Sequence, residues 1–291
     1  MTLLISKGAS IINRRLMVGL LMMSANIAAE PKRFIDAHSH YEGEYAEQFT
    51  PQQLIETLDQ HSIDRILITA KPNQLTQQLV TEYPKRIIPF LSVYQAHDDK
   101  ARWMTDTSIP EQIRHELNRF KYAGIGELHL FEQDKTSPVF EEIIDIARRR
   151  NLPLLVHGDA EVIHHLYTIN PEARVLWAHM GTQPDPSILD ELLIRYPALH
   201  IDTSVREGLL LGIHQVNGVF DPRLSDHWRH FFVKHQDRIL AAVDTFSVNR
   251  WKRYGEVMDQ MALWLTQLPD PVQHKIRYEN AQRFFKLALQ D

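Results

Sequence analysis

The chain has 291 residues, enough for one large domain or two small ones. Its hydrophobic content of 44% and charged content of 24% are ordinary for a soluble globular protein. A net charge of -5 without a long basic run gives no sign of nucleic acid binding. The chain has no cysteine, which excludes disulfides, thiol nucleophiles and zinc–thiolate sites. Any metal must therefore be held by nitrogen and oxygen atoms.

The N-terminal segment 1–29 has the features of a secretory signal peptide. Arg14 and Arg15 precede an apolar run at residues 16–23, and small residues follow it up to Ala29. A basic region, a short apolar core and a small-residue cleavage site are typical of exported proteins. The apolar run is too short to span a bilayer, so we expect cleavage after Ala29 and a periplasmic or secreted protein with no membrane span. The arginine pair also fits the twin-arginine route, weakly. A translation start at an internal methionine is the alternative.

Residues 30–291 are expected to form one domain, in which short apolar runs alternate with segments of helical period. Residues 51 and 138 are prolines preceded by Thr50 and Ser137, a pattern typical of helix starts. The segment 95–120 is longer than a simple connection, and we expect a short extra helix or a lid-like loop there. Eight apolar runs predict strands, at residues 34–40, 64–70, 87–94, 124–131, 153–159, 174–181, 199–205 and 238–245.

Eight apolar strands alternating with helices predict an all-parallel sheet, because parallel strands need crossovers and are covered on both faces. Eight such units close a (β/α)8 TIM barrel of the α/β class. An open doubly wound sheet is the alternative. Such a sheet usually carries a glycine-rich phosphate loop after its first strand, and the sequence DAHSHYEGEYAE at residues 36–47 is not one.

Residues of the kind that bind metals stand at or near the ends of five of these predicted strands. Because the carboxyl ends of parallel barrel strands converge at one mouth, where active sites lie, we expect these side chains to meet there. Nitrogen and oxygen ligands of this type suit zinc, manganese, iron or nickel. The residues are His38, His40, Glu127, His157, His179 and Asp244.

In this order the motifs resemble the amidohydrolase superfamily of metal-dependent hydrolases, from Phe34 to near the end of the chain. The match includes FIDAHSH on the first strand, the histidines of the fifth and sixth strands and the aspartate of the eighth. YENAQRFF at residues 278–285 is similar to a helix start common in the amidohydrolase-2 branch. GIGELHLF at residues 124–131 resembles the Gly-Glu segment of phosphotriesterase-like and TatD-like members.

The resemblance implies a ligand set for one or two divalent ions, with zinc as the expected metal. His38, His40 and Asp244 would bind the more buried ion, and His157 and His179 the second.

The number of ions depends on Glu127, which in the phosphotriesterase-like and TatD-like members bridges two metals. Many amidohydrolase-2 enzymes use a single metal, and their sixth-strand histidine, here His179, is catalytic instead. The resemblance favours two ions. A carboxylate that pairs with a cation at the barrel mouth is the alternative for Glu127.

The expected chemistry is hydrolysis of an amide, ester, lactone or phosphoester bond in a small molecule. A bound metal lowers the pKa of water, and Asp244 would pass the proton to the leaving group. Arg206 and His129 are candidates for substrate binding, and Asp36 is expected to orient a ligand. A single-metal decarboxylase and a non-catalytic metal-binding barrel are the alternatives. The sequence does not indicate the substrate or the oligomeric state.

Overall fold

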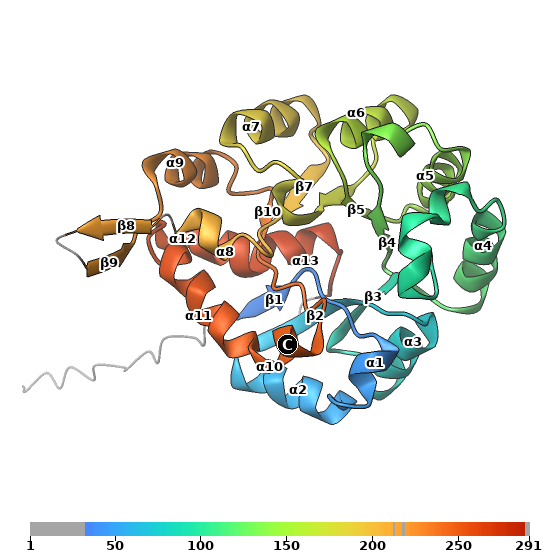
Figure 1. Cartoon of the computed structure of the whole chain (residues 1–291), viewed down its shortest axis with the longest axis horizontal. Coiled ribbons are helices and arrows are strands. Elements are labelled where there is room, and N and C mark those ends of the chain that lie inside the picture. Colours follow the sequence, from blue (N-terminus) through green and yellow to red (C-terminus); the bar gives the residue numbers. More distant parts are fainter. Residues whose placement is uncertain (1–32, 212, 217–218, 289–291) are drawn as a thin grey trace, which may run out of the picture. The chain divides into compact units, whose positions relative to one another are not determined.

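A computed structural model describes residues 33–211, 213–216 and 219–288. The expected signal peptide lies outside these residues. Eight strands form one sheet in which every paired neighbour is parallel (Figure 1). The sheet has the order β1 (Phe34–Asp36), β2 (Ile63–Thr69), β3 (Ile87–Leu91), β4 (Gly124–His129), β5 (Leu154–His157), β6 (Val175–Trp177), β7 (Leu199–Asp202) and β10 (Ile239–Leu240).

Two backbone hydrogen bonds join the segments that directly follow the first and last strands of the sheet. The Ala37 amide donates to the Ala241 carbonyl at 3.1 Å, and the Asp244 amide donates to the His38 carbonyl at 2.7 Å. These bonds bring the two edges together, so the eight strands form a nearly closed barrel. The predicted (β/α)8 fold is confirmed.

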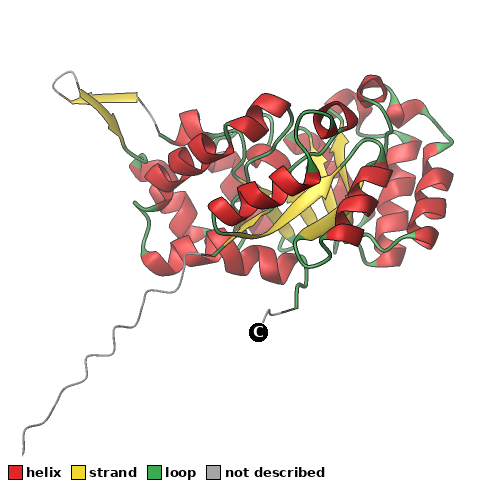
Figure 2. Cartoon of the chain, turned by 90° about the horizontal axis from the view of Figure 1, so that it is seen from below, coloured by secondary structure: helices red, strands yellow, loops and turns green. Residues whose placement is uncertain are grey.

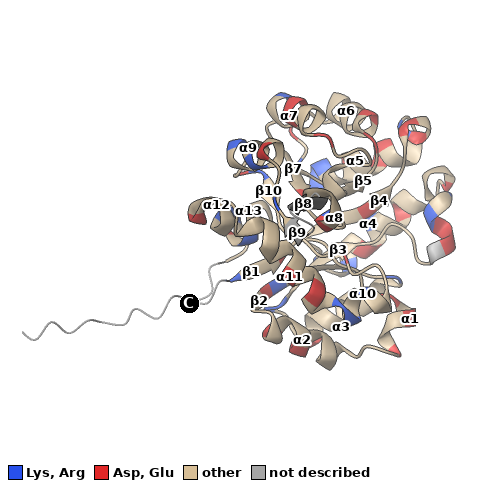
Figure 3. Cartoon of the chain, turned by 60° about the vertical axis from the view of Figure 1, so that its left-hand side comes forward, with Lys and Arg blue, Asp and Glu red and all other residues tan. Residues whose placement is uncertain are grey.

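Helices lie around the strands, as the view from below shows (Figure 2). Acidic and basic residues are interspersed along them (Figure 3). No helix in the described ranges is both long and apolar enough to cross a membrane. The helices are α1 (Gly43–Ala46), α2 (Pro51–Gln60), α3 (Asn73–Glu82), α4 (Ile109–Arg119), α5 (Pro138–Arg150), α6 (Ala160–Ile169), α7 (Pro186–Arg195), α8 (Glu207–Leu210), α9 (Asp226–Lys234), α10 (Val248–Lys252), α11 (Tyr254–Leu265), α12 (Asp270–His274) and α13 (Asn280–Phe284).

Both predicted helix starts are present. Thr50 caps α2 by accepting a hydrogen bond from the Gln53 amide, and the Gln53 side chain accepts from the Thr50 amide in return. Ser137 caps α5 by accepting from the Phe140 amide. The predicted extra structure after β3 also exists, as two short 3-10 helices, η1 (His97–Ala101) and η2 (Trp103–Thr105), ahead of α4. Three more short turns are η3 (Glu132–Asp134), η4 (Ala178–Met180) and the π-helical η5 (Lys275–Glu279).

The buried apolar residues form two clusters, one between strands and helices and a smaller one inside the barrel. The inner cluster includes Ile35, Leu67, Phe90, Leu176 and Phe284. Its members come mostly from the strands and from α13, so the barrel interior is packed rather than open.

Two features differ from the sequence expectations. Most strands are shorter than predicted, and β1 ends at Asp36, so His38 and His40 follow the strand instead of lying within it. A two-stranded antiparallel hairpin, β8 (Ile213–Val216) and β9 (Val219–Pro222), follows β7 and was not predicted. It stands outside the barrel sheet, so the parallel β/α repeat that guided the prediction gave no sign of it.

Candidate metal centre

The six predicted ligands meet at the mouth of the barrel, around the carboxylate of Glu127. This carboxylate is 3% exposed and lies within 3.6 Å of five imidazole rings. Three groups of residues could each hold a metal ion, since the ligand atoms of each group lie within 4.8 Å of one another. The groups are His38, His40 and Glu127; Glu127, His157 and His179; and His38, His179 and Asp244.

The two oxygens of Glu127 face different histidines. Oε2 lies 3.2 Å from His40 Nε2 and 3.6 Å from His38 Nε2. Oε1 lies 3.0 Å from His157 Nδ1 and 3.4 Å from His179 Nε2. A carboxylate divided in this way can give one oxygen to each of two ions, as the sequence resemblance implied.

The position of Glu127 depends on the glycine before it. Gly126 has a φ of 136°, and a Cβ atom there would lie 2.3 Å from the Leu155 carbonyl oxygen on β5. Only glycine allows both this backbone conformation and this close approach. The β4–β5 register shifts at the same point, between Ile125 and Leu128, and the Gly126–Glu127 peptide is cis. The irregular stretch of β4 carries the central carboxylate.

Asp202, at the end of β7, orients two of the histidines and was not predicted. Its Oδ2 accepts a hydrogen bond from His38 Nδ1 at 3.0 Å, which leaves Nε2 of that ring free for a metal. Its Oδ1 accepts from the backbone amide of His179 at 3.1 Å. In the sequence Asp202 closes an apolar run as Asp244 does, so this placement is the signal that could have identified it.

His179 is held in an unusual conformation. Its φ is 59°, in the left-handed region, and its Nδ1 lies 2.7 Å from the Ser204 hydroxyl. The ring stacks 5.0 Å from the ring of His38, between Glu127 and Asp244. The local backbone therefore aims Nε2 at the centre of the site.

Three buried polar atoms in the site have no hydrogen-bond partner among the described residues, namely His38 Nε2, His40 Nδ1 and Asp244 Oδ1. Burying such atoms without a partner is costly. All three atoms belong to the residues that the sequence resemblance assigned to the more buried ion. Nitrogen and carboxylate donors of this kind suit a divalent ion such as zinc, and the residues fit such an ion.

Asp36 supports the backbone of the ligands rather than their side chains. It accepts hydrogen bonds from the amides of His38 and Val243, at 3.2 and 3.0 Å, and from the Tyr254 hydroxyl on α11, at 2.8 Å. Burial raises the pKa of its carboxyl to about 6, although these hydrogen bonds oppose the shift. It ties together the two segments that carry His38 and Asp244.

Charge pairing dominates the ionisation of the centre. Burial disfavours the ionised form of Glu127, but His129, His38 and the other rings outweigh it and hold the pKa of this carboxyl well below its usual range. Burial also disfavours a charged His38, yet Glu127, Asp244 and Asp202 together raise the pKa of that ring. The rings are not alike, because burial lowers the pKa of His129 well below its usual value although Glu127 opposes the shift.

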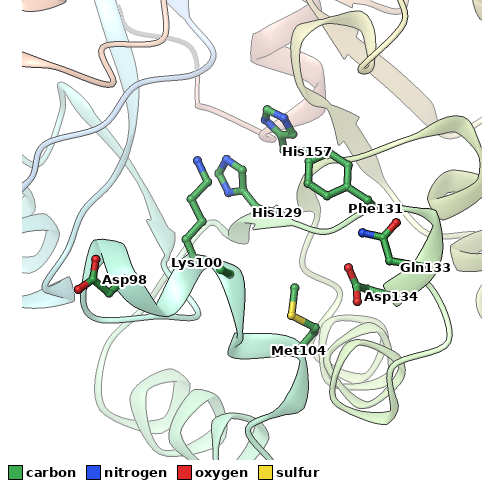
Figure 4. Close-up of a pocket in the computed structure, with 9 residues that line it drawn as sticks. Asp98, Lys100, Met104, His129, Phe131, Gln133, Asp134 and His157 are labelled. Carbon is green, nitrogen blue, oxygen red and sulfur yellow. The ribbon is translucent and has the colours of Figure 1, made fainter.

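The centre opens into a cavity of about 330 Å³. A larger cavity of about 660 Å³ shares His129, His157 and Lys100 with it (Figure 4). The smaller cavity is lined by His40, Glu42, Lys71, Lys100, Glu127, His129, His157, His179, Val205, Arg206, Asp244 and Phe246.

The two predicted substrate-binding residues both line the smaller cavity. Arg206 donates from Nε to the His179 carbonyl and from one terminal nitrogen to the Gly181 carbonyl, each at 2.7 Å. His129 lies with Nε2 3.2 Å from Glu127 Oε2 and with Nδ1 2.7 Å from the Tyr94 hydroxyl. Both side chains are therefore already held by the protein, and a role in substrate binding stays a prediction.

No protein-family model and no curated protein matches the sequence. Solved structures do match the fold. The phosphotriesterase homology protein of Escherichia coli, with phosphate in its active site, has a TM-score of 0.62 at 12% identity, covering 88% of this chain and 99% of its own. A TatD homologue of Escherichia coli K12 has a TM-score of 0.61 at 16% identity, covering 88% and 98%. An amidohydrolase of Burkholderia multivorans with bound zinc has a TM-score of 0.55 at 12% identity, covering 88% and 99%.

These neighbours are members of the superfamily that the sequence motifs resemble. Their likeness to this chain confirms the expected barrel fold. At such low identity the likeness establishes the barrel, and the chemistry has to be argued from the site.

Proposed function

We propose that the chain is a metal-dependent hydrolase of the amidohydrolase superfamily, which uses water to cleave an amide, ester, lactone or phosphoester bond of a small molecule. The observation that carries the proposal is the division of the Glu127 carboxylate between two histidine groups. The fold of its structural neighbours, one of which contains zinc, supports the same class.

The proposed metal centre has two ions, with zinc as the favoured metal and manganese, iron or nickel as alternatives. His38, His40 and Asp244 would hold one ion, His157 and His179 the other, and Glu127 would be shared. Bound divalent ions would supply Lewis-acid activation of water and of the bond to be broken.

Asp244 is proposed to move the proton. Its Oδ1 has no hydrogen-bond partner among the described residues and lies 3.3 Å from His40 Nε2, while Oδ2 lies 3.8 Å from His179 Nε2. The carboxylate lines the cavity in which a substrate would bind. It can therefore accept a proton from the attacking water and deliver it to the leaving group.

The test combines metal analysis with an activity screen. Purified protein, stripped with a chelator and reloaded with zinc, should bind close to two ions per chain by elemental analysis. It should hydrolyse at least one member of a panel of lactones, amides, esters and phosphoesters, and the stripped protein should not. One ion per chain with release of carbon dioxide from an aromatic acid would instead support the single-metal decarboxylase. Tight metal binding without turnover on either panel would support a non-catalytic barrel.

Export to the periplasm or the medium is a second proposal, and it rests on the sequence of residues 1–29 alone. Sequencing of the N-terminus of protein purified from its native cell should begin near Glu30. Recovery of the full-length chain from the cytoplasm would contradict export.

A further inference from the structure

A lysine stands at the junction of the two cavities. Lys100, on η1, lines both the cavity over the metal centre and the larger one beside it. Within the described residues, neither an ion pair nor a hydrogen bond engages its ammonium group. Figure 4 shows its side chain extended toward His129. A cation in this position faces the space that a substrate would fill.

The other cations of the smaller cavity are already engaged. Lys71 forms an ion pair with Glu42, and its ammonium lies 5.1 Å from the ring centre of Tyr94. Arg206 donates to two backbone carbonyls. Lys100 is therefore the cationic group in this lining with the most to gain from a bound anion.

Burial makes the lack of a partner costly for Lys100. Partial burial lowers the pKa of its ammonium, and Lys71 adds to this effect, although Glu127, Asp244 and Glu42 oppose it. An anion that binds the ammonium would offset the loss of water around it.

The lining of the larger cavity also indicates what the rest of a bound ligand would be. Ala101, Met104 and Phe131 form apolar parts of the larger cavity, and Phe131 is 41% exposed there. Asp98 and Asp134 line the larger cavity but not the smaller one. An anionic group therefore gains most beside Lys100, with an apolar body against Met104 and Phe131.

We infer that the substrate carries a carboxylate or a phosphate, which Lys100 binds at the junction of the two cavities, next to an apolar or aromatic body. This inference rests on the proposed function for what happens to the substrate, but anion binding can be measured without turnover. Lys100 would then be the residue that distinguishes anionic from neutral substrates of the same shape.

The test compares benzoate with benzamide, which has the same shape without the charge, by calorimetric titration of the zinc-loaded protein. Wild type should bind benzoate about 10- to 100-fold more tightly, as expected for a hydrogen bond between charged groups. The Lys100→Met variant should lose this preference, and Lys100→Arg should retain it. Phenylphosphonate serves as a third ligand: tighter binding than benzoate assigns the site to phosphate, and weaker binding assigns it to carboxylate.

The exposed Lys121 provides the matched control, and Lys121→Met should bind like wild type. A benzoate preference that persists in Lys100→Met would place the carboxylate on the metal or on Arg206 and would overturn the inference. Equal binding of benzoate and benzamide by wild type, or no binding of benzoate in the millimolar range, would also overturn it. If Lys100→Met loses the preference for benzoate while the wild type hydrolyses nothing on the panel, the anion-binding role of Lys100 is supported and the hydrolase proposal is contradicted.

Discussion

The two ends of the barrel interior surround their polar residues differently. At the mouth they have polar and charged partners, whereas at the opposite end they pack against apolar side chains. Strand β7 contributes one residue to each end. Asp202, at the mouth, accepts hydrogen bonds from His38, His179 and Ser204. His200, two residues earlier on the same face of the strand, packs 4.8 Å from the ring of Phe284 in the apolar inner cluster.

The difference shows that buried charged groups are concentrated at the mouth of the barrel. At the mouth, burial of charged groups is offset by opposite charges and by places for metal ions. Around His200 the pKa is lowered by burial to about 4, so that ring is neutral at ordinary pH. Changes at the mouth should therefore alter chemistry and metal binding, whereas a change at His200 should alter only stability.

The largest effect is expected from Asp244→Asn. Asparagine keeps the size and one coordinating oxygen, tolerates the positive φ of 57° at this position, and cannot accept a proton at neutral pH. Turnover should fall roughly 10²- to 10⁴-fold while the fold and much of the metal remain. Steady-state kinetics, elemental analysis and circular dichroism check these three points. Near-normal turnover of the metal-loaded variant would show that another group, with His179 as the first candidate, carries the proton.

Glu127→Gln should remove one of the two ions. The amide keeps one oxygen acceptor but loses the negative charge that both histidine groups face, so the shared position is lost. Metal content should fall from about two ions per chain toward one. The exposed Glu256 offers a control, since Glu256→Gln should keep both ions. If the wild type already holds a single ion, the two-metal centre is wrong.

Asp202→Asn should weaken metal binding although Asp202 is not itself a proposed metal ligand. Each carboxylate oxygen of Asp202 accepts hydrogen bonds, Oδ2 from His38 and Oδ1 from Ser204 and the His179 amide. In either orientation the new amide nitrogen would face a donor, so one histidine loses its support. Zinc affinity should fall roughly 10- to 100-fold in a competition assay with a chelator. Unchanged affinity, matching that of the exposed control Asp259→Asn, would show that Asp202 has no positioning role.

The sequence indicated the candidate metal ligands of the mouth better than the residues that orient those ligands or face the substrate cavity. Metal-binding residue types at or near the ends of apolar runs are visible because a parallel barrel brings strand ends together, and the four histidines, Glu127 and Asp244 do meet. Asp202 also closes an apolar run, but it acts by hydrogen bonds that orient ligands, and in the sequence it cannot be told from an ordinary polar residue at a strand end. Lys100 sits on a short 3-10 helix whose position depends on packing against the rest of the protein. No periodicity in sequence reports such a position.

The same reason explains the errors in the fold. Apolar runs located all eight barrel strands, but they did not fix where each strand ends, because the ligand-bearing residues leave the regular ladder. His38 and His40 were expected within the first strand, at residues 34–40, whereas the backbone after Asp36 turns both rings, 5.3 Å apart, into the site. The β8–β9 hairpin was missed because it lies outside the parallel repeat.

The smallest effect is expected at the end of the barrel interior opposite the mouth, where His200 should make the free energy of unfolding depend on pH. The pKa of this ring is about 4 in the folded protein and about 6.5 in an unfolded chain. Between these values the unfolded chain binds more protons, so the free energy of unfolding rises with pH and falls as pH is lowered through this window. Through this one group, stability should be roughly 2 kcal/mol lower at pH 5 than at pH 7.

Urea unfolding at both pH values can isolate this contribution by comparing variants. His200→Gln cannot titrate, so its stability should change less between pH 7 and pH 5 than that of wild type. His115, whose side chain is 63% exposed on α4, supplies the control, because His115→Gln should keep the wild-type dependence. Equal pH dependence in wild type and His200→Gln would mean that the ring is not held neutral by burial. The proposed contrast between a charged barrel mouth and an uncharged opposite end of the barrel interior would then be wrong for His200.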